Sequence, residues 1–179
     1  MNILPRTQFG DPILRKKAKK ISFSLFRTRK GKELIRRMLY TMFRTKGVGL
    51  AAPQVGKSIA LAVMRMIPFS RHPDLERIGP IVIVNHKITN YSRKKLYDWE
   101  GCLSCSGMRG LVPRSKEITV EYYNLHGEKV VERAKGYWAR IFQHEVDHLN
   151  GNLYIDRMDD IKTLMTLKEL KKKLKKKLK

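Results

Sequence analysis

The chain has 179 residues, 42% of them hydrophobic and 8% aromatic, which is typical of one globular domain and too apolar for a wholly disordered chain. No stretch approaches the roughly 18 consecutive apolar residues of a membrane helix, so we expect no integral membrane segment. Thirty-nine Lys and Arg against sixteen Asp and Glu give a net charge of +23, which favours encounters with polyanions such as RNA, DNA or an acidic membrane surface.

Hydrophobic periodicity in the first half of the chain predicts one helix and two strands. Apolar residues at helical spacing predict a helix over residues 34–42, followed by a Gly- and Pro-rich loop at 47–54. Continuous apolar runs predict buried strands at 59–66 and 81–84. A polar loop with three prolines, 68–80, separates the two strands.

The second half begins with a predicted hairpin and ends with two predicted helices. A strand with alternating apolar residues at 118–122 leads through a turn at 125–128 into a second strand at 129–131. A helical pattern over 137–150 stops at Gly151. In the terminal helix an apolar stripe lies against lysines and consists of Leu164, Leu167, Leu170, Leu174 and Leu178. These elements predict a single α+β domain.

The sharpest chemical signal is the segment from His144 to His148. Positions i and i+4 share one face of a helix, so both imidazoles can reach one metal ion. Glu145 lies about 100° around the helix from His144, where it suits a general base acting on water held by the metal. The alternative interpretation is a surface helix with two solvated histidines.

A catalytic metal needs a third protein ligand and an open fourth position. A metalloprotease of the zincin type would take this ligand from a downstream His or acid, and none of the downstream acids is a compelling candidate: Asp156, Asp159, Asp160 and Glu169. Upstream, Cys102 lies in a glycine-flanked turn, and a thiolate binds borderline-soft divalent metals well. Cys102 with the two histidines would leave one position for water.

Cys105 opens a different possibility. Cys102 and Cys105 form a C-x-x-C pair that could join His144 and His148 in a structural Cys2His2 zinc site, which would indicate a noncatalytic, basic, RNA- or ribosome-associated module. Thirty-eight residues separate the two pairs, far more than in a zinc finger. A closed site would also leave Glu145 without a role. Otherwise Cys105 is a small buried thiol.

Three motifs together resemble the signature motifs of peptide deformylases in order and spacing: Gly47-Val48-Gly49-Leu50-Ala51-Ala52-Pro53-Gln54, Glu100-Gly101-Cys102-Leu103-Ser104 and His144-Glu145-Val146-Asp147-His148. The resemblance extends over about residues 5–158. It implies a metal-dependent hydrolase that removes the formyl group from the N-terminal formylmethionine of newly synthesised polypeptides. Residues 1–160 would form the catalytic domain, with antiparallel strands packed around the metal-binding helix, and 161–179 its basic amphipathic C-terminal helix.

The resemblance also implies roles for individual residues. Cys102, His144 and His148 would bind one divalent metal ion, ferrous iron first, with zinc, nickel or cobalt as alternatives. Glu145 would take a proton from the water at the metal as it attacks the formyl carbon, and would later give it to the departing amine. The amide of Gln54 and the backbone N–H of Leu103 would stabilise the oxyanion.

Four further residues are expected to line the substrate site. Val48 and Gly49 would lie along the cleft, where a glycine lets an extended peptide backbone approach closely. Gly101 would contribute from the opposite side. Ile141, one turn before His144, would help to form the pocket for the methionine side chain, or would be plain core packing.

Two further expectations concern the motif that contains Cys102, here called the cysteine motif. We expect Arg114 to pair with Glu100 and so to hold the cysteine loop. The family often continues this motif with an aliphatic residue and Pro-Gly, whereas this chain has Cys105-Ser106-Gly107. The difference bears on the rigidity and the oxidant sensitivity of the loop, and not on the reaction.

The expected partners follow from the family and the charge. The substrates would be N-formylmethionyl nascent peptides, and the basic segment 169–179 would dock on ribosomal RNA. An anionic membrane surface, or no partner at all, are the alternatives for this helix. Only two cysteines, without a secretory signal, favour a reducing, cytoplasmic location.

Overall fold

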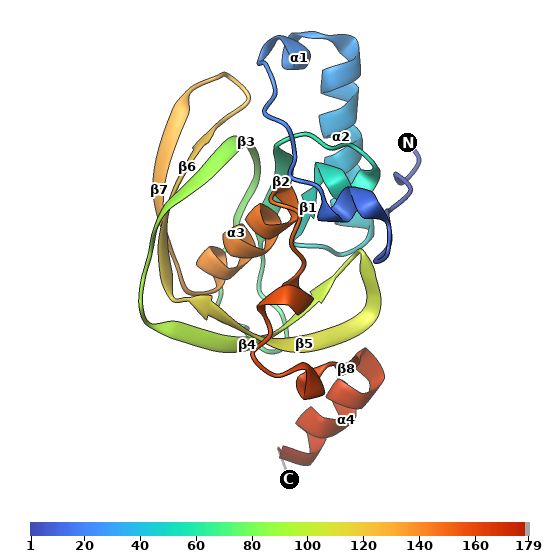
Figure 1. Ribbon diagram of the computed structural model, residues 1–179, viewed down its shortest axis with the longest axis vertical. Helices are drawn as coiled ribbons and strands as arrows, with labels where there is room; N and C mark the ends of the chain where they lie inside the picture. Colours follow the sequence, from blue (N-terminus) through green and yellow to red (C-terminus); the bar gives the residue numbers. More distant parts are fainter. Residues whose placement is uncertain (178–179) are drawn as a thin grey trace.

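The computed structural model describes residues 1–177, which form two antiparallel sheets and four α-helices (Figure 1). The helices are α1 (Ser24–Arg27), α2 (Arg29–Arg44), α3 (Gly136–Leu149) and α4 (Leu167–Lys177). The strands are β1 (Gly49–Ala51), β2 (Leu61–Met66), β3 (Ile78–Tyr91), β4 (Lys95–Cys102), β5 (Cys105–Ser115), β6 (Glu117–Tyr123), β7 (Lys129–Lys135) and β8 (Met165–Thr166).

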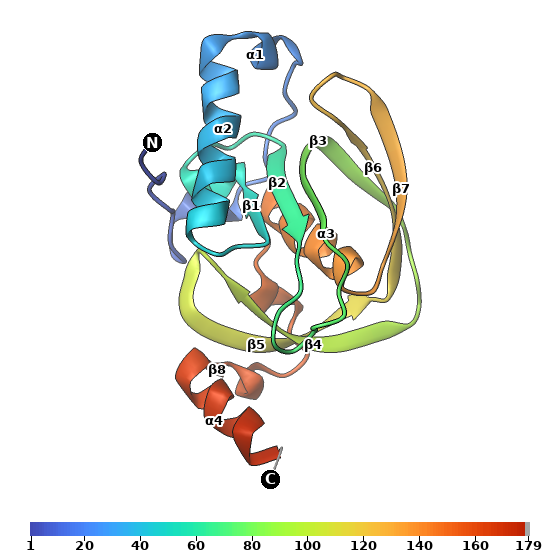
Figure 2. The ribbon, with the colours of Figure 1, turned by 180° about the vertical axis from the view of Figure 1, so that it is seen from behind.

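The two sheets pack against the central helix α3, and each sheet has two outer strands. Five strands pair in the order β1-β2-β3-β6-β7, and three pair in the order β4-β5-β8. Helix α3 contacts strands of both sheets and crosses the middle of the molecule in both views (Figures 1 and 2). Within the described chain, the outer strands are β1 and β7 in the larger sheet and β4 and β8 in the smaller one.

Helix α3 is buried on nearly all sides, because the sheets wrap around it. Trp138, Phe142 and Leu149 pack into the main hydrophobic cluster with side chains of β2, β3 and β6. The helix ends where Gly151 adopts a φ of +78°, and a Cβ at this position would lie 2.7 Å from the carbonyl oxygen of Arg15. Only glycine satisfies both demands, so the N-terminal segment can pack closely against the end of α3.

The predicted α+β class and the antiparallel strands are confirmed, but several boundaries differ. Helix α2 begins at Arg29, earlier than predicted, because Thr28 caps it by accepting a hydrogen bond from the N–H of Gly31 (3.0 Å) and its first turn has no apolar periodicity to detect. Strand β2 begins only at Leu61, and β3 is longer than predicted. Strands β4 and β5 were not predicted, and Cys102 ends β4 instead of lying in a glycine-flanked turn. Residues 49–51, predicted as part of a loop, form β1 because they pair with β2.

The basic C-terminal helix is present, with a shorter range than predicted. Helix α4 begins at Leu167, so Leu164 precedes it, and Leu178 lies outside the described residues. Leu170 is buried, and the ammonium of Lys173 lies 5.6 Å from the centre of the Trp99 ring. The helix is thus attached to the small sheet. None of the helices over residues 1–177 has the length and hydropathy needed to cross a bilayer.

Strand β3 carries a histidine whose burial makes stability pH-dependent. Burial, with a contribution from Lys17, lowers the pKa of His86 to about 4. The folded state therefore favours the neutral ring, and its stability is complete above the unfolded pKa of about 6.5 and falls as the pH drops towards 4. We expect His86 to account for a loss of about 2 kcal/mol in unfolding free energy between pH 7 and pH 5.

Urea unfolding of the wild type and of His86→Gln at pH 7 and pH 5 measures this contribution. The variant should lose about 2 kcal/mol less than the wild type over the same interval, since all other titrating groups are shared. Parallel losses in the two proteins would contradict the assignment.

Candidate active site

Three potential ligands from two distant segments meet on one side of α3. The side chains of Cys102, His144 and His148 offer ligand atoms that all lie within 4.8 Å of one another. Cys102 comes from the end of β4, whereas the histidines lie one turn apart on α3. The Sγ of Cys102 is 3.1 Å from Nε2 of His148. One sulfur and two imidazole nitrogens at this spacing suit a single borderline-soft divalent ion.

A buried ion-pair network holds His144 in a fixed orientation. Its Nδ1 lies 2.9 Å from Oε2 of Glu100, so Nε2 is the nitrogen directed towards the ligand cluster. Glu100 also accepts from Arg114 (2.9 and 3.0 Å) and from Arg140 (2.7 Å). The predicted Arg114–Glu100 pair is therefore present. A carboxylate on the far nitrogen is the usual way in which proteins fix the tautomer of a metal-binding histidine.

Asp147, which also lies on α3, extends this ion-pair network. It accepts from Arg114 (2.5 Å) and from Arg157 (2.7 Å). The neighbouring cations hold the pKa of Glu100 far below its usual range despite burial, and the two carboxylates raise the pKa of Arg114. Glu100 and Arg114 therefore remain charged over the physiological pH range, which keeps the support of His144 rigid.

The surroundings of Cys102 suit a thiolate. Its Sγ receives hydrogen bonds from Nε2 of Gln54 and from the backbone N–H of Ser104, each at 3.3 Å. A hydrogen bond with Cys105 and burial raise the pKa of Cys102 in the absence of a cation, and a bound divalent ion reverses this preference. The donor set therefore fits a metal ion.

Cys105 lies opposite Cys102 in the β4–β5 hairpin, where the two residues are paired in register. It is buried and packs with Leu14, Leu153 and Tyr154. Among the described residues, the ligand cluster contains Cys102 and the two histidines without Cys105. Its packing is that of a small apolar side chain.

Glu145 is a buried carboxylate with an unused oxygen. Its Oε2 has no hydrogen-bond partner among residues 1–177, and burial raises its pKa to about 7. A Cβ on Gly49 of β1 would overlap the carboxyl group. A carboxyl group whose pKa is near neutral pH, and which has an oxygen without a hydrogen-bond partner, is a candidate general acid and base.

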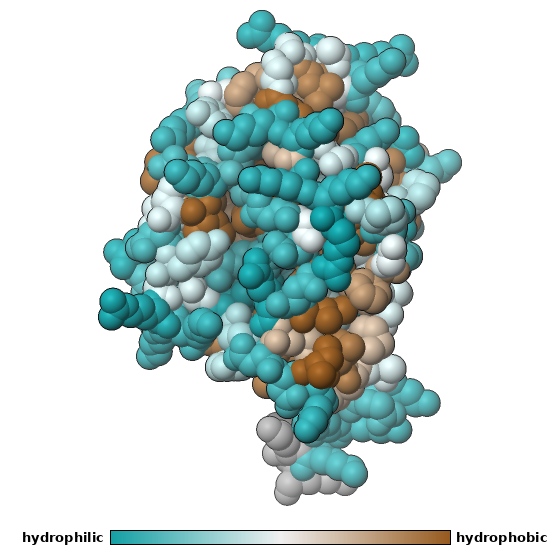
Figure 3. Space-filling view, in the orientation of Figure 1, coloured by the Kyte–Doolittle hydropathy of each residue, from teal (hydrophilic) through white to brown (hydrophobic). Residues whose placement is uncertain are grey.

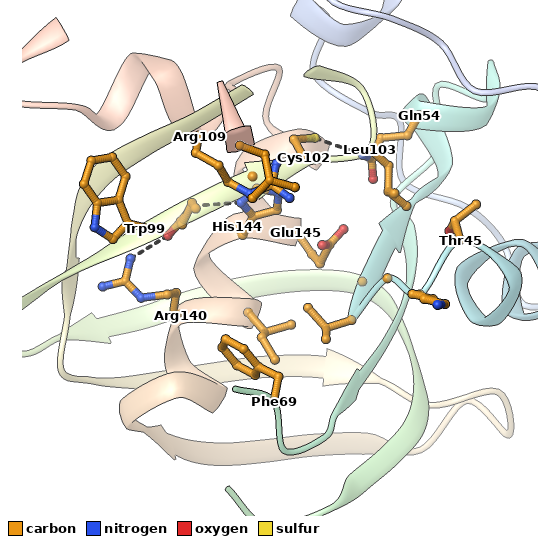
Figure 4. Close-up of a pocket in the computed structure, with 18 of the residues that line it drawn as sticks. Thr45, Gln54, Phe69, Trp99, Cys102, Leu103, Arg109, Arg140, His144 and Glu145 are labelled. Atoms are coloured by element: carbon orange, nitrogen blue, oxygen red, sulfur yellow. Dashed lines mark hydrogen bonds and ion pairs between the residues drawn. The ribbon is translucent and has the colours of Figure 1, made fainter. Parts of the chain in front are cut away.

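A cavity of about 480 Å³ contains these groups and opens between β1 and β4. Figure 4 shows Cys102, His144 and Glu145 directed towards its centre, with Gln54 and Leu103 at one end and Trp99 and Arg140 at the other. All the residues expected at the substrate site line the cavity as well: Val48, Gly49, Gly101 and Ile141. His148 is buried and is not one of the residues that line the cavity.

The amide of Gln54 is oriented by its own loop. Its Oε1 accepts a hydrogen bond from the backbone N–H of Ala51 (2.8 Å), so the NH₂ group points towards Cys102 and the cavity. It also lies 3.3 Å from Oγ of Ser104. The Gly- and Pro-rich sequence thus folds into a short 3-10 turn that directs one side-chain donor into the site.

Some residues of the site carry no sequence signal that reveals their role. Arg140 lies on α3 and bonds Glu100 and two backbone carbonyls, those of Val112 and Leu96. The ring of Tyr154 stacks on His144 with a centroid distance of 6.2 Å. Their contacts come from segments distant in sequence, whereas the pairing of Glu100 with Arg114 was predicted from the charges of their motifs.

Comparison with known proteins assigns the chain to a family. The polypeptide deformylase family model matches residues 3–164. Peptide deformylase 2 of a Nostoc species is 39% identical over 167 residues, which cover 93% of this chain and 92% of the relative. The peptide deformylase of Thermotoga neapolitana is 44% identical over 165 residues, with coverages of 90% and 91%.

Solved structures agree with the sequence comparison. The Met-Ala-Ser-bound class I type b peptide deformylase of Acinetobacter baumannii superposes with a TM-score of 0.84 and 38% identity, over 88% of this chain and 99% of that one. The actinonin-bound enzyme of Synechococcus elongatus gives a TM-score of 0.77 and 37% identity, over 89% and 81%. The chain therefore belongs to the peptide deformylases, metalloenzymes that remove the formyl group from N-terminal formylmethionine.

Proposed function

We propose that this chain deformylates nascent peptides through a metal ion held by Cys102, His144 and His148, with Glu145 as the general acid and base. The observation that carries the proposal is the convergence of the three ligand atoms beside an unpaired, buried carboxylate in one cavity. Held by these three residues, a divalent ion would supply Lewis-acid chemistry, which would lower the pKa of a water molecule and polarise the formyl group. We propose ferrous iron, although zinc, nickel and cobalt accept the same ligands.

Glu145 moves the proton. Its carboxylate accepts a proton from the attacking water while the water oxygen bonds to the formyl carbon. When the carbon–nitrogen bond breaks, Glu145 gives the proton to the amine nitrogen, and formate and the free methionyl peptide leave. Burial favours this cycle, because it raises the pKa of Glu145 towards neutrality and makes both proton transfers feasible at physiological pH.

Two hydrogen-bond donors stabilise the oxygen on which negative charge develops. Gln54 supplies its side-chain NH₂, already directed into the cavity by the contact between Oε1 and Ala51. The backbone N–H of Leu103 supplies the second donor from the turn next to Cys102. Neutral donors fixed before the reaction lower the barrier without reorganisation.

The peptide would bind between β1 and β4, which are outer strands of different sheets. Val48 and Gly49 adjoin one side of the cavity and Gly101 the other, so an extended peptide can add to either edge through backbone hydrogen bonds. Ile141 on α3 offers an apolar surface for the methionine side chain. The Met-Ala-Ser peptide in the A. baumannii relative supports this class of ligand.

Gly49→Ala tests the contact between β1 and the general base. The added methyl group would overlap the carboxyl group of Glu145, so the side chain must move and kcat/KM should fall about 100-fold. Gly47→Ala is the matched control, because the tightest contact of its Cβ would be the flexible tip of Leu103 at 3.2 Å, and the other contacts are at ordinary distances. Equal losses in the two variants would contradict a specific effect on Glu145.

The reaction is tested by formate release from a short N-formylmethionyl peptide. The protein is purified without oxygen and loaded with ferrous iron, and the product is identified by mass as the peptide without its formyl group. We expect turnover that disappears on chelation and returns with metal. Cleavage of an internal peptide bond would instead indicate a protease, and the absence of both reactions with metal bound would overturn the proposal.

We also propose that α4 brings the enzyme to the ribosome in the cytoplasm. Its exposed side chains are almost all lysines, and Leu170 fixes the helix to the domain. Binding to ribosomal RNA through such a helix would be independent of sequence and steeply salt-dependent. Cosedimentation with ribosomes, compared with a chain ending at residue 166, tests this partner.

A further inference from the structure

A second strongly basic region lies at the end of the molecule opposite α4. Residues 15–44 contain twelve Lys and Arg and a single acid, Glu33. They include α1 and α2, which lie together at one end of the molecule, with α4 at the other end in both views (Figures 1 and 2). Hydrophilic side chains project from this upper end in Figure 3. Residues 15–44 and α4 are thus two separate basic regions of the chain.

Four cations gather where α1 meets α2: Arg27, Arg29, Lys30 and Lys32, here called the junction cluster. All four are exposed, and none forms an ion pair with a carboxylate of residues 1–177. A shallow cavity of about 430 Å³ is lined by three of them together with Glu33 and Arg36. Glu33 forms its ion pair with Arg36 (2.8 Å). The four positive charges of the junction cluster are therefore not neutralised by this carboxylate.

The positive charges of the junction cluster are expected to destabilise α2. The first turn of α2 contains Arg29, Lys30 and Lys32 and no acidic residue. Cations at a helix N-terminus are repelled by the positive end of the helix dipole, which ordinarily selects acidic residues there. A charge pattern that works against local stability indicates a role in binding.

The backbone at the junction is fixed, so the cations are presented as a set. Gly31 lies so close to the carbonyl of Leu25 that a Cβ would overlap it, which requires glycine where α1 packs on α2. Thr28 caps α2 through the N–H of Gly31. Presentation of several charges on a rigid turn reduces the entropy lost on binding.

The chemistry of the surface fits phosphates better than a membrane. The apolar side of α2 is already buried in the core through Ile35, Met38 and Met42, so no hydrophobic face remains to enter a bilayer, as an interfacial helix requires. The four neighbouring cations of the junction cluster suit the repeating negative charges of a phosphodiester backbone. We propose that the junction cluster binds the phosphate backbone of a folded nucleic acid, independently of α4 and of the active site.

The experiment compares two variants that lose the same charge. One replaces the junction cluster (Arg27, Arg29, Lys30 and Lys32) by Gln, and the control replaces two other exposed arginines and two other exposed lysines, Arg77, Lys87, Arg93 and Lys94, by Gln. Binding to a 16-base-pair RNA duplex, and to DNA of the same sequence, is measured by fluorescence anisotropy between about 50 and 300 mM salt. Formate release and thermal unfolding are measured on every protein.

The junction variant should bind about 100-fold more weakly at 100 mM salt, and the slope of log K against log salt should decrease by about 3. The control should stay within about threefold of the wild type, and the tighter of the two duplexes identifies the type of nucleic acid. The junction variant should also unfold about 2 °C higher, since the helix dipole is relieved, with unchanged deformylation of short peptides.

Two results would overturn the proposal. Equal losses in both variants would mean that binding follows the overall charge and not this surface. Tight binding to vesicles with 30% phosphatidylserine, lost in the junction variant while the duplexes bind as before, would assign the surface to a membrane. Since the short-peptide activity is measured separately, a failure here is distinguishable from a failure of the proposed reaction.

Discussion

Replacing Glu145 by Gln should reduce kcat/KM for formate release about 10³-fold, while the protein still binds one metal ion. The amide keeps the size of the side chain but can no longer carry a proton from the attacking water to the amine. The ligands Cys102, His144 and His148 are unchanged, so metal analysis of the purified variant should equal that of the wild type. Formate assays at saturating and at low peptide concentration would place the loss in kcat.

The stability of this variant provides an independent check. In the wild type, Oε2 of Glu145 is buried without a partner among residues 1–177, and a buried, unpaired carboxyl group costs free energy. Glu145→Gln should therefore unfold at the same temperature as the wild type or higher. Retained turnover would refute the role of Glu145, whereas lost turnover together with lost metal would indicate a structural fault instead.

Replacing Cys102 by Ala should abolish both metal binding and turnover. Even the loss of a group that only orients a ligand weakens metal affinity by about 10–100-fold, so the loss of a ligand itself should cost more. The expected result is a metal content near zero after dialysis, and no formate release beyond background. Cys105→Ala is the matched control, because this buried thiol packs against Leu14 and Tyr154 and should be dispensable for metal and activity.

The same pair of variants separates the alternative interpretations. A zincin-like protease with an acidic third ligand would keep its metal in Cys102→Ala. A structural Cys2His2 site would lose metal in both cysteine variants and would tolerate Glu145→Gln. Metal retained in Cys102→Ala would therefore overturn the proposed ligand set.

The sequence is most informative where function depends on local spacing. His144 and His148 share a helix face because four residues separate them, and that geometry follows from the helix alone. The hairpin at β6–β7 was also predicted, since its turn and its alternating strands are local signals. Strands β4 and β5 escaped prediction because their side chains alternate irregularly and their stability comes from pairing with each other and, for β5, from packing on α3.

The sequence by itself determined the α+β class, the family, and the candidate metal ligands, general base and hydrogen-bond donors. Short motifs identify these residues without any knowledge of the tertiary structure. Only the tertiary structure decided that Cys102 reaches the histidines, that Glu100 orients His144, and that Gly49 lies against Glu145. These contacts join segments far apart in the chain, and their geometry depends on sheet pairing and on buried ion pairs. No local pattern encodes such distances, so the active site takes its shape only when the two sheets close around α3.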